Sequence, residues 1–219
     1  MWGRKKLEVV PVINCEDYEC VKKKLGKAES FLKDNSWLHI DVADGLFTFN
    51  KTWGSPRDWA TLRLPYKIEV HLMVEEPERC VSDWLAAGAK RLIVHVETIK
   101  NDSLDKILSL SSKYKASVML SFNPETPVRK IEPYFQKLNA FQVLAVSPGA
   151  GGQKFLPTVL DKIDFLRRHL PNVKIEVDGG MSLAVAKLAK AAGADSVTSG
   201  AYIFTSPNPK EAYERLQKV

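Results

Sequence analysis

Cysteine is scarce in this sequence, which has three such residues, Cys15, Cys20 and Cys80, and no CxxC pair. A small and odd count without paired spacing argues against a structural zinc site and against a disulfide framework. Unpaired thiols are typical of a reducing compartment, so the sequence predicts a cytoplasmic protein.

Long apolar runs are also missing. No apolar stretch reaches about 18 residues, the length that a membrane-spanning helix requires. The apolar run at residues 7–13 contains Glu8 and Pro11, and no small-residue cleavage site follows it. We therefore interpret this run as a strand and not as a signal peptide, and we expect no membrane partner.

Linkers, low-complexity segments and a GxGxxG motif after the first predicted strand are absent as well. The first two absences predict one domain over residues 1–219, and the third argues against a dinucleotide-binding sheet. The formal net charge of +6 fits a nucleic acid, an anionic membrane or a small acidic substrate. Because the lysines and arginines are scattered, we expect a solvated surface and no nucleic-acid partner.

The chain does contain an alternation of short β-rich runs with amphipathic helical segments. The runs are rich in Val, Ile and Leu, as in parallel strands covered on both faces. Strands are predicted at 8–14, 37–44, 67–74, 91–97, 116–122, 140–147, 174–178 and 196–200. Helices are predicted at 17–32, 77–87, 104–114, 127–138, 159–169, 184–192 and 209–216, with a short, poorly defined segment at 55–62. Eight such units in 219 residues predict an α/β fold, a single (β/α)8 TIM barrel with parallel strands.

Ionisable side chains gather near the carboxyl ends of the predicted strands, where barrels carry their functional residues. His39 and Asp41 are two positions apart on one strand and so point to the same face, while His71 and Asp178 belong to two other strands. Each residue alone is more typical of a hydrogen-bonding role, but the late position of these histidines and of His95 favours a site. Such groups are costly in a barrel mouth unless they are paired or bind a metal. A set of two His and two Asp suits one divalent metal ion, Zn, Fe, Mn or Co.

Glycine-rich segments follow the last three predicted strands. They contain the pairs Gly151–Gly152, Gly179–Gly180 and Gly200–Ala201. Glycine lets backbone N–H groups approach a phosphate closely, and barrels often bind phosphate in these late loops. A single glycine pair is more typical of a tight turn, but three in successive loops favour a phosphate site.

Six motifs make the sequence similar to the ribulose-phosphate 3-epimerase family. They are HIDVADG at 39–45 with Asn50 shortly after, HLMVEEP at 71–77, HVE at 95–97, NPETP at 123–127, PGAGGQKF at 148–155 and EVDGG at 176–180. They occur in the order of the family and cover roughly residues 9–216. The combination of HxDxxDG, HLM and GxGGQ is more specific than the DGG motif, which several phosphate-binding barrels share.

The resemblance implies a metal-dependent epimerase that acts at C3 of a ketose phosphate, most simply D-ribulose 5-phosphate to D-xylulose 5-phosphate. It implies that His39, Asp41, His71 and Asp178 bind the metal and that Asp41 and Asp178 are also the acid–base pair. The phosphate would lie on the backbone of the three glycine-rich segments, and Met73 would be an apolar wall near the metal, although a plain core role fits Met73 equally well. Two carboxylates on opposite faces of the sugar suit removal and return of a proton through an enediolate.

The sequence also departs from the family. Family members usually have Ser where this chain has Cys15, and Ser where it has Ala201. Other departures are Ala43, Leu144, Ser147 and Ala150, where the family usually has Met, Met, Asn and Phe. These changes alter the expected pocket wall and phosphate loop but remove no expected metal ligand or proton carrier.

Three alternatives stay open. The smaller residues Ala43 and Ala150 would admit a ketohexose 6-phosphate to the same 3-epimerase mechanism. A metal-free phosphate-binding barrel, a lyase or a decarboxylase, would lack the paired His39 and His71. A non-catalytic sugar-phosphate binder would have lost Asp41 or Asp178. The sequence leaves open which metal is bound and whether the chain forms a homo-oligomer.

Overall fold

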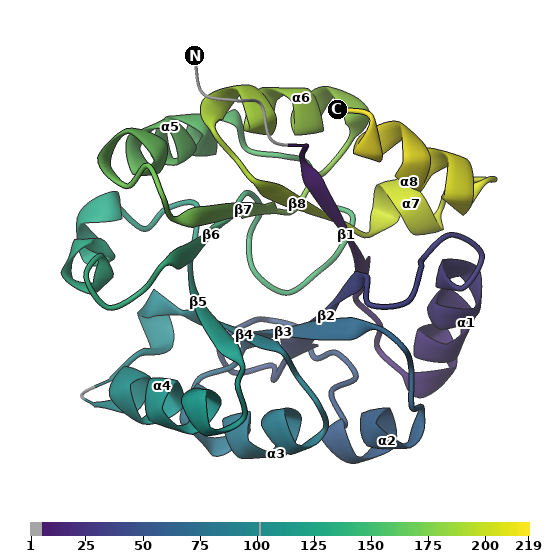
Figure 1. Ribbon diagram of the computed structural model, residues 1–219, viewed down its shortest axis with the longest axis horizontal. Coiled ribbons are helices and arrows are strands. Elements are labelled where there is room, and N and C mark those ends of the chain that lie inside the picture. Colours follow the sequence, from purple (N-terminus) through teal and green to yellow (C-terminus); the bar gives the residue numbers. More distant parts are fainter. Residues whose placement is uncertain (1–5, 101) are drawn as a thin grey trace.

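A computed structural model of the chain describes residues 6–100 and 102–219. Eight parallel strands form a closed barrel in sequence order, with β1 paired to β8, and the helices surround it (Figure 1). The strands are β1 (Glu8–Ile13), β2 (Trp37–Ala43), β3 (Lys67–Met73), β4 (Arg91–His95), β5 (Ser117–Phe122), β6 (Ala140–Leu144), β7 (Lys174–Asp178) and β8 (Ser196–Ser199). The predicted fold class is confirmed.

The α-helices form the outer ring. They are α1 (Tyr18–Ala28), α2 (Pro56–Thr61), α3 (Val81–Ala86), α4 (Ser103–Lys113), α5 (Leu160–His169), α6 (Leu183–Ala192), α7 (Ala201–Phe204) and α8 (Pro209–Gln217). Short 3-10 helices occupy Pro77–Arg79, Val96–Thr98, Val128–Lys130, Glu132–Tyr134 and Pro157–Val159. The prediction of one domain also covers residues 1–5, which lie outside the described residues.

Side chains of the strands alternate between two environments. On β2, Leu38, Ile40 and Val42 belong to the hydrophobic core between barrel and helices, whereas His39 and Asp41 point into the barrel. The barrel interior contains a small apolar cluster of Ile93, Met119 and Ala140 together with buried polar side chains. Because burial outside the barrel provides the hydrophobic stabilisation, inward positions are free to carry ionisable groups.

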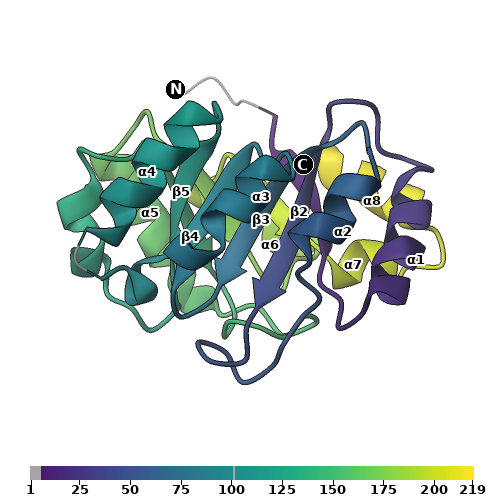
Figure 2. The ribbon, with the colours of Figure 1, turned by 90° about the horizontal axis from the view of Figure 1, so that it is seen from below.

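The strands direct their carboxyl ends to one rim of the barrel. Figure 2 shows β2 and β3 running toward this rim, where the loop after β2 projects farthest. Several strands end earlier than predicted: β4 ends at His95 and β6 at Leu144. The residues that follow form loops at the rim, which is where the candidate site residues lie.

One predicted helix is wrong. The segment 127–138 forms two 3-10 helices, Val128–Lys130 and Glu132–Tyr134. Pro133 lies inside the second of them and has no backbone N–H to donate, so a continuous α-helix is interrupted there. The four-residue helix α7 was not predicted, because it is shorter than one period of the apolar pattern that indicates a helix.

The sequence argued against a disulfide framework, but the described residues contain one disulfide. Cys15 and Cys20 are bonded, with their Cα atoms 5.7 Å apart, and Cys80 is a free thiol. Cys15 follows β1, and Cys20 lies in the first turn of α1, where its backbone N–H donates to Asp17 Oδ1 at 2.8 Å. The turn between strand and helix therefore brings the two cysteines together, a contact that spacing rules for metal or redox motifs do not detect.

Substitution of Cys20 by serine is expected to lower the free energy of unfolding by about 2 kcal/mol, the chain-entropy value for a loop this short. Urea unfolding measures the difference. The same loss is expected when the parent protein is treated with a reductant, while Cys20→Ser should not respond to reductant and Cys80→Ser should still respond. Equal stability of the oxidised and reduced parent would contradict the bridge.

No helix in the described part of the chain combines the length and the apolar character needed to cross a bilayer.

Candidate active site

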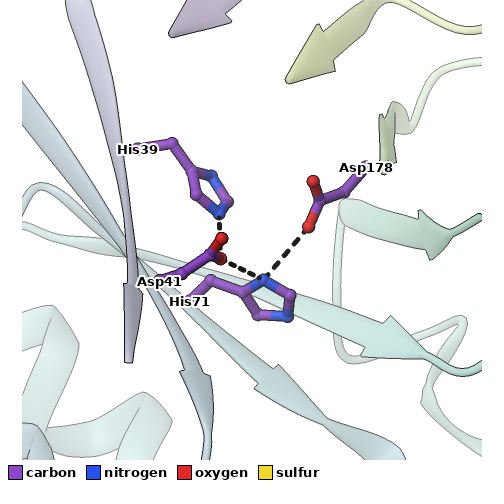
Figure 3. Close-up of side chains that lie close together, drawn as sticks. All are labelled: His39, Asp41, His71 and Asp178. Atoms are coloured by element: carbon purple, nitrogen blue, oxygen red, sulfur yellow. Dashed lines mark hydrogen bonds and ion pairs between the residues drawn. The ribbon is translucent and has the colours of Figure 1, made fainter. Parts of the chain in front are cut away.

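Three strands bring two histidines and two aspartates together inside the rim. His39 and Asp41 come from β2, Asp41 lies opposite His71 of β3 in the strand register, and Asp178 is the last residue of β7. All four are buried, and their side chains converge on one point (Figure 3). The four residues that the sequence singled out as metal ligands are therefore neighbours.

The spacing of these side chains fits a metal ion. His71 Nδ1 lies 3.2 Å from both Asp41 Oδ1 and Asp178 Oδ2, and His39 Nε2 lies 3.1 Å from Asp41 Oδ1. One ligand atom of each residue falls within 4.8 Å of the others. Ligands about 2.0–2.2 Å from a common ion are separated from one another by roughly 3–3.5 Å, so the donor set and its spacing are compatible with one divalent cation.

Hydrogen bonds in the barrel interior orient His39. Its Nδ1 lies 2.7 Å from Glu69 Oε1, so the Nδ1–H donates to the carboxylate and Nε2 is left facing Asp41. Glu69 is completely buried and also pairs with Arg91. A carboxylate behind a histidine fixes the tautomer and orientation that a metal ligand needs.

A chain of hydrogen bonds through His95 to Glu97 orients His71. Its Nε2 lies 2.8 Å from His95 Nε2, and His95 Nδ1 lies 3.2 Å from Glu97 Oε2. Burial lowers the pKa of His95, so this ring is neutral at pH 7. It then donates from Nδ1 to Glu97 and accepts at Nε2 from His71. Burial opposes protonation of His71, but hydrogen bonds to Asp178 and Asp41 raise its pKa, so His71 Nδ1 donates to these carboxylates and offers its lone pair only when a cation displaces that proton.

Charges in the cluster stabilise one another despite burial. Burial opposes protonation of His39, but hydrogen bonds to Asp41 and Glu69 raise its pKa well above the usual value. Burial likewise opposes ionisation of Asp41, but hydrogen bonds with His39 and His71 hold its pKa far below the usual range. The carboxylate of Asp41 is therefore ionised at neutral pH, and protons on the imidazoles compete with any cation for this place.

A cavity of about 750 Å³ opens above the cluster. Asp41 and Asp178 are part of its wall, together with every residue that the sequence assigned to substrate or phosphate: Cys15, Met73, Gly151, Gly152, Gly179, Gly180, Gly200 and Ala201. His39 and His71 lie beneath it with no exposed surface. The three glycine-rich segments are thus parts of one cavity wall, although they follow three different strands.

The departures from the family pattern lie partly on this wall. Leu144, Ser147 and Ala150 line the cavity, whereas Ala43 is buried in the structure and does not. Ala43 therefore gives no support to a wider pocket, and Ala150 remains the small residue that faces the cavity.

Sequence reasoning missed three kinds of supporting residue. Glu69 could have been found, because it lies two positions before His71 and so shares its inward face. Glu97 lies two positions after His95 but beyond the end of β4, in the 3-10 helix Val96–Thr98, so strand alternation does not indicate its role. Asn14, whose Nδ2 lies 2.9 Å from Asp41 Oδ2, follows the end of a strand and has no distinguishing sequence signal.

Comparison with known proteins agrees with this geometry. The model of the ribulose-phosphate 3 epimerase family matches residues 8–204. The ribulose-phosphate 3-epimerase of Schizosaccharomyces pombe is 34% identical over 96% of this chain and 92% of its own length, and a cytoplasmic isoform from Oryza sativa is 35% identical over 83% and 81%. Among solved structures, a 3-hexulose-6-phosphate synthase aligns with a TM-score of 0.73 at 15% identity over 97% of this chain and 99% of its own. An orotidine 5'-phosphate decarboxylase from Pyrococcus horikoshii aligns with a TM-score of 0.67 at 19% identity over 96% and 97%. These two structures share the fold.

Proposed function

The chain belongs to the ribulose-phosphate 3-epimerase family, and from this premise we propose that it interconverts D-ribulose 5-phosphate and D-xylulose 5-phosphate. The observation that carries the proposal is the placement of Asp41 and Asp178. They come from β2 and β7, their carboxylates flank His71 Nδ1, and both face the same cavity. A sugar in this cavity has a carboxylate available on either face of one carbon.

His39, Asp41, His71 and Asp178 would hold one divalent cation, Zn, Fe, Mn or Co, since mixed imidazole and carboxylate sets suit these ions. When bound, such an ion supplies Lewis-acid stabilisation of negative charge that develops on oxygen. The buried carboxylate of Glu69 and the His95–Glu97 pair keep the two imidazoles in the required orientation.

Asp41 and Asp178 exchange a proton with C3 of the sugar. One ionised carboxylate removes the C3 proton, the electron pair of that C–H bond passes into the C2–C3 bond, and an enediolate results. The other carboxyl group, protonated, returns a proton to C3 on the opposite face. The roles of the two aspartates are reversed in the reverse reaction, and no redox cofactor is required.

The glycine-rich segments would bind the phosphate through backbone N–H groups. Gly152, Gly179 and Gly180 have positive φ values of 77°, 104° and 63°, a conformation that glycine adopts at low cost. A Cβ on Gly180 would lie 2.3 Å from the backbone nitrogen of Phe155, and a Cβ on Gly179 would lie 2.5 Å from Val146, so the loop after β7 has no room for side chains at these two positions. Backbone groups, and not side chains, are therefore available to a phosphate here.

Substitution of Gly152 by valine is expected to raise KM for the phosphorylated sugar strongly, because a β-branched side chain would obstruct the approach of phosphate. Gly88→Val is a matched control. Gly88 also has a positive φ and open space around its Cβ position, but it does not line the cavity, so this variant should lose stability and keep KM. Steady-state kinetics of both variants decide, and an unchanged KM in Gly152→Val would remove this segment from the phosphate site.

A coupled assay on D-ribulose 5-phosphate, with protein reconstituted with each of the four metals, tests the proposed function. A ketohexose 6-phosphate belongs in the same assay, because Ala150 leaves a small side chain on the cavity wall. Turnover of the pentulose above the hexulose supports the proposal, and the opposite order would identify the hexulose as substrate. A protein that binds no metal and turns over neither sugar would favour the lyase or decarboxylase alternative.

A cytoplasmic location is part of the proposal and is supported by the cytoplasmic isoform among the relatives. A reducing cytoplasm would keep Cys15 and Cys20 as thiols. A small sugar phosphate is the proposed partner. The absence of nucleic-acid and membrane partners stays a prediction, and the sequence does not decide whether the chain forms a homo-oligomer.

A further inference from the structure

Asn14 connects two parts of the cavity that the sequence keeps far apart. It directly follows β1 and lines the cavity. Its side-chain Nδ2 donates to Asp41 Oδ2 on one side and to the backbone oxygen of Gly149 on the other, each at 2.9 Å. An amide NH2 group has two protons, and both are used in this bridge.

The two oxygens of Asp41 have different partners. Oδ1 faces the rings of His39 and His71 at 3.1 and 3.2 Å, whereas Oδ2 accepts from Asn14. The terminal torsion of an aspartate has a broad energy minimum, so contacts at both oxygens are needed to fix the carboxylate plane. Asn14 therefore sets the rotation of the carboxylate that meets the sugar.

The other end of the bridge lies in the loop that would bind phosphate. Gly149 precedes Gly151 and Gly152, has a φ of 112° and donates its N–H to Met73 Sδ at 3.2 Å. A Cβ at Gly149 would lie 2.0 Å from Asn50 Oδ1, so the loop packs directly against the Asn50 side chain. A Cβ at Gly151 would lie 3.7 Å from the Asn14 side chain, so Asn14 lies against the loop at both Gly149 and Gly151.

The backbone of Asn14 is itself held in place. Its carbonyl oxygen accepts from Lys24 Nζ of α1 at 2.6 Å. The Asn14 backbone is therefore fixed while its Nδ2 donates one proton to Asp41 and the other to the carbonyl of Gly149.

We propose that Asn14 is a positioning residue that couples the seating of the 147–153 loop to the orientation of the Asp41 carboxylate. The inference rests on the proposed function for the role of Asp41. Its consequence is that phosphate bound to the loop helps to align the group that moves the C3 proton. Loss of the bridge should then affect kcat more than KM.

Asn14→Leu keeps the size of the side chain and removes both donors. We expect kcat to fall by about 10–100-fold, the range for residues that support functional ligands, with KM changed by less than about threefold, metal content unchanged and little change in Tm. Asn14→Asp places a second carboxylate acceptor against Asp41, and its kcat should fall at least as far as that of Asn14→Leu. Asn208→Leu, which removes a helix N-cap at α8, is the control for a purely structural loss and should lower Tm while keeping kcat.

A kcat of Asn14→Leu within twofold of the parent overturns the proposal. Loss of metal and of Tm in proportion to the loss of kcat also overturns it, because the role would then be structural.

Hydrogen exchange gives a readout that does not depend on turnover. Inorganic phosphate should slow exchange of the 147–153 amides in the parent and have a much smaller effect in Asn14→Leu, and equal protection in both would contradict the coupling. If the parent fails to epimerise ribulose 5-phosphate, the proposed function falls, while the exchange experiment still decides whether Asn14 holds the loop.

Discussion

Replacement of Asp178 by asparagine is expected to lower kcat by about 10²–10⁴-fold, the usual contribution of a general acid–base group. The substitution keeps the size of the side chain and its contact distance to His71 while removing the proton acceptor. The same loss is expected for Asp41→Asn. Asp164→Asn, which changes an exposed carboxylate paired with Arg168 on α5, should leave kcat unchanged.

Isotope exchange distinguishes the two aspartates more sharply than rates do. In D2O a single turnover of the parent should place deuterium at C3 of the product, because the proton that arrives comes from a different group than the one that left. Each asparagine variant retains one carboxylate, so it should still exchange the C3 hydrogen of one epimer, and the two variants should differ in which epimer exchanges. A product that keeps the substrate's own C3 hydrogen would show that one base moves the proton across both faces. Metal content is measured in each variant so that a lost ion is not mistaken for a lost base.

Replacement of His71 by alanine is expected to remove the bound metal and to reduce activity by about 10³-fold or more, since Lewis-acid stabilisation is worth several kcal/mol. His71 Nδ1 lies between the two carboxylates, so its loss opens the centre of the ligand set. Elemental analysis after dialysis measures occupancy, expected to be one ion per chain in the parent.

His169→Ala provides the control for this experiment. His169 lies on α5, where its Nδ1 contacts the backbone of Phe165 at 2.8 Å and its ring stacks on that side chain. Its removal should leave both occupancy and activity intact. Full metal occupancy in His71→Ala would overturn the assignment of the ligand set, and treatment of the parent with a chelator should reproduce the loss of activity and restore it when metal is added back.

The barrel was predictable because its signal is repeated along the chain. Each strand that is covered on both faces appears in the sequence as an apolar run, and the helices between the strands have a regular apolar stripe. An error at a single boundary therefore does not change the predicted fold class. The segment 127–138 was mispredicted where a single residue, Pro133, outweighs an otherwise helical pattern. The disulfide was missed because it depends on the turn between β1 and α1 and on no spacing rule.

The centre of the site was predictable for a different reason. His39 and Asp41 share a face by the alternation of a strand, and parallel strands bring their carboxyl ends to one rim, so the convergence with His71 and Asp178 follows from the fold. The contacts of Asn14 could not be predicted in this way. Its two partners lie 27 and 135 positions away, and an asparagine after a strand is ordinary in a turn.

The four clustered side chains come from distant parts of the chain, and this has a consequence for biosynthesis. Three of them, on β2 and β3, emerge early from the ribosome, but Asp178 ends the seventh strand. A nascent chain can therefore present an incomplete ligand set long before the barrel closes, and chains fold from the N-terminus as they are made. If the four residues hold a cation as proposed, their ligand set is complete only when β7 takes its place beside β6 and β8, so binding by the full set would mark the completion of the barrel.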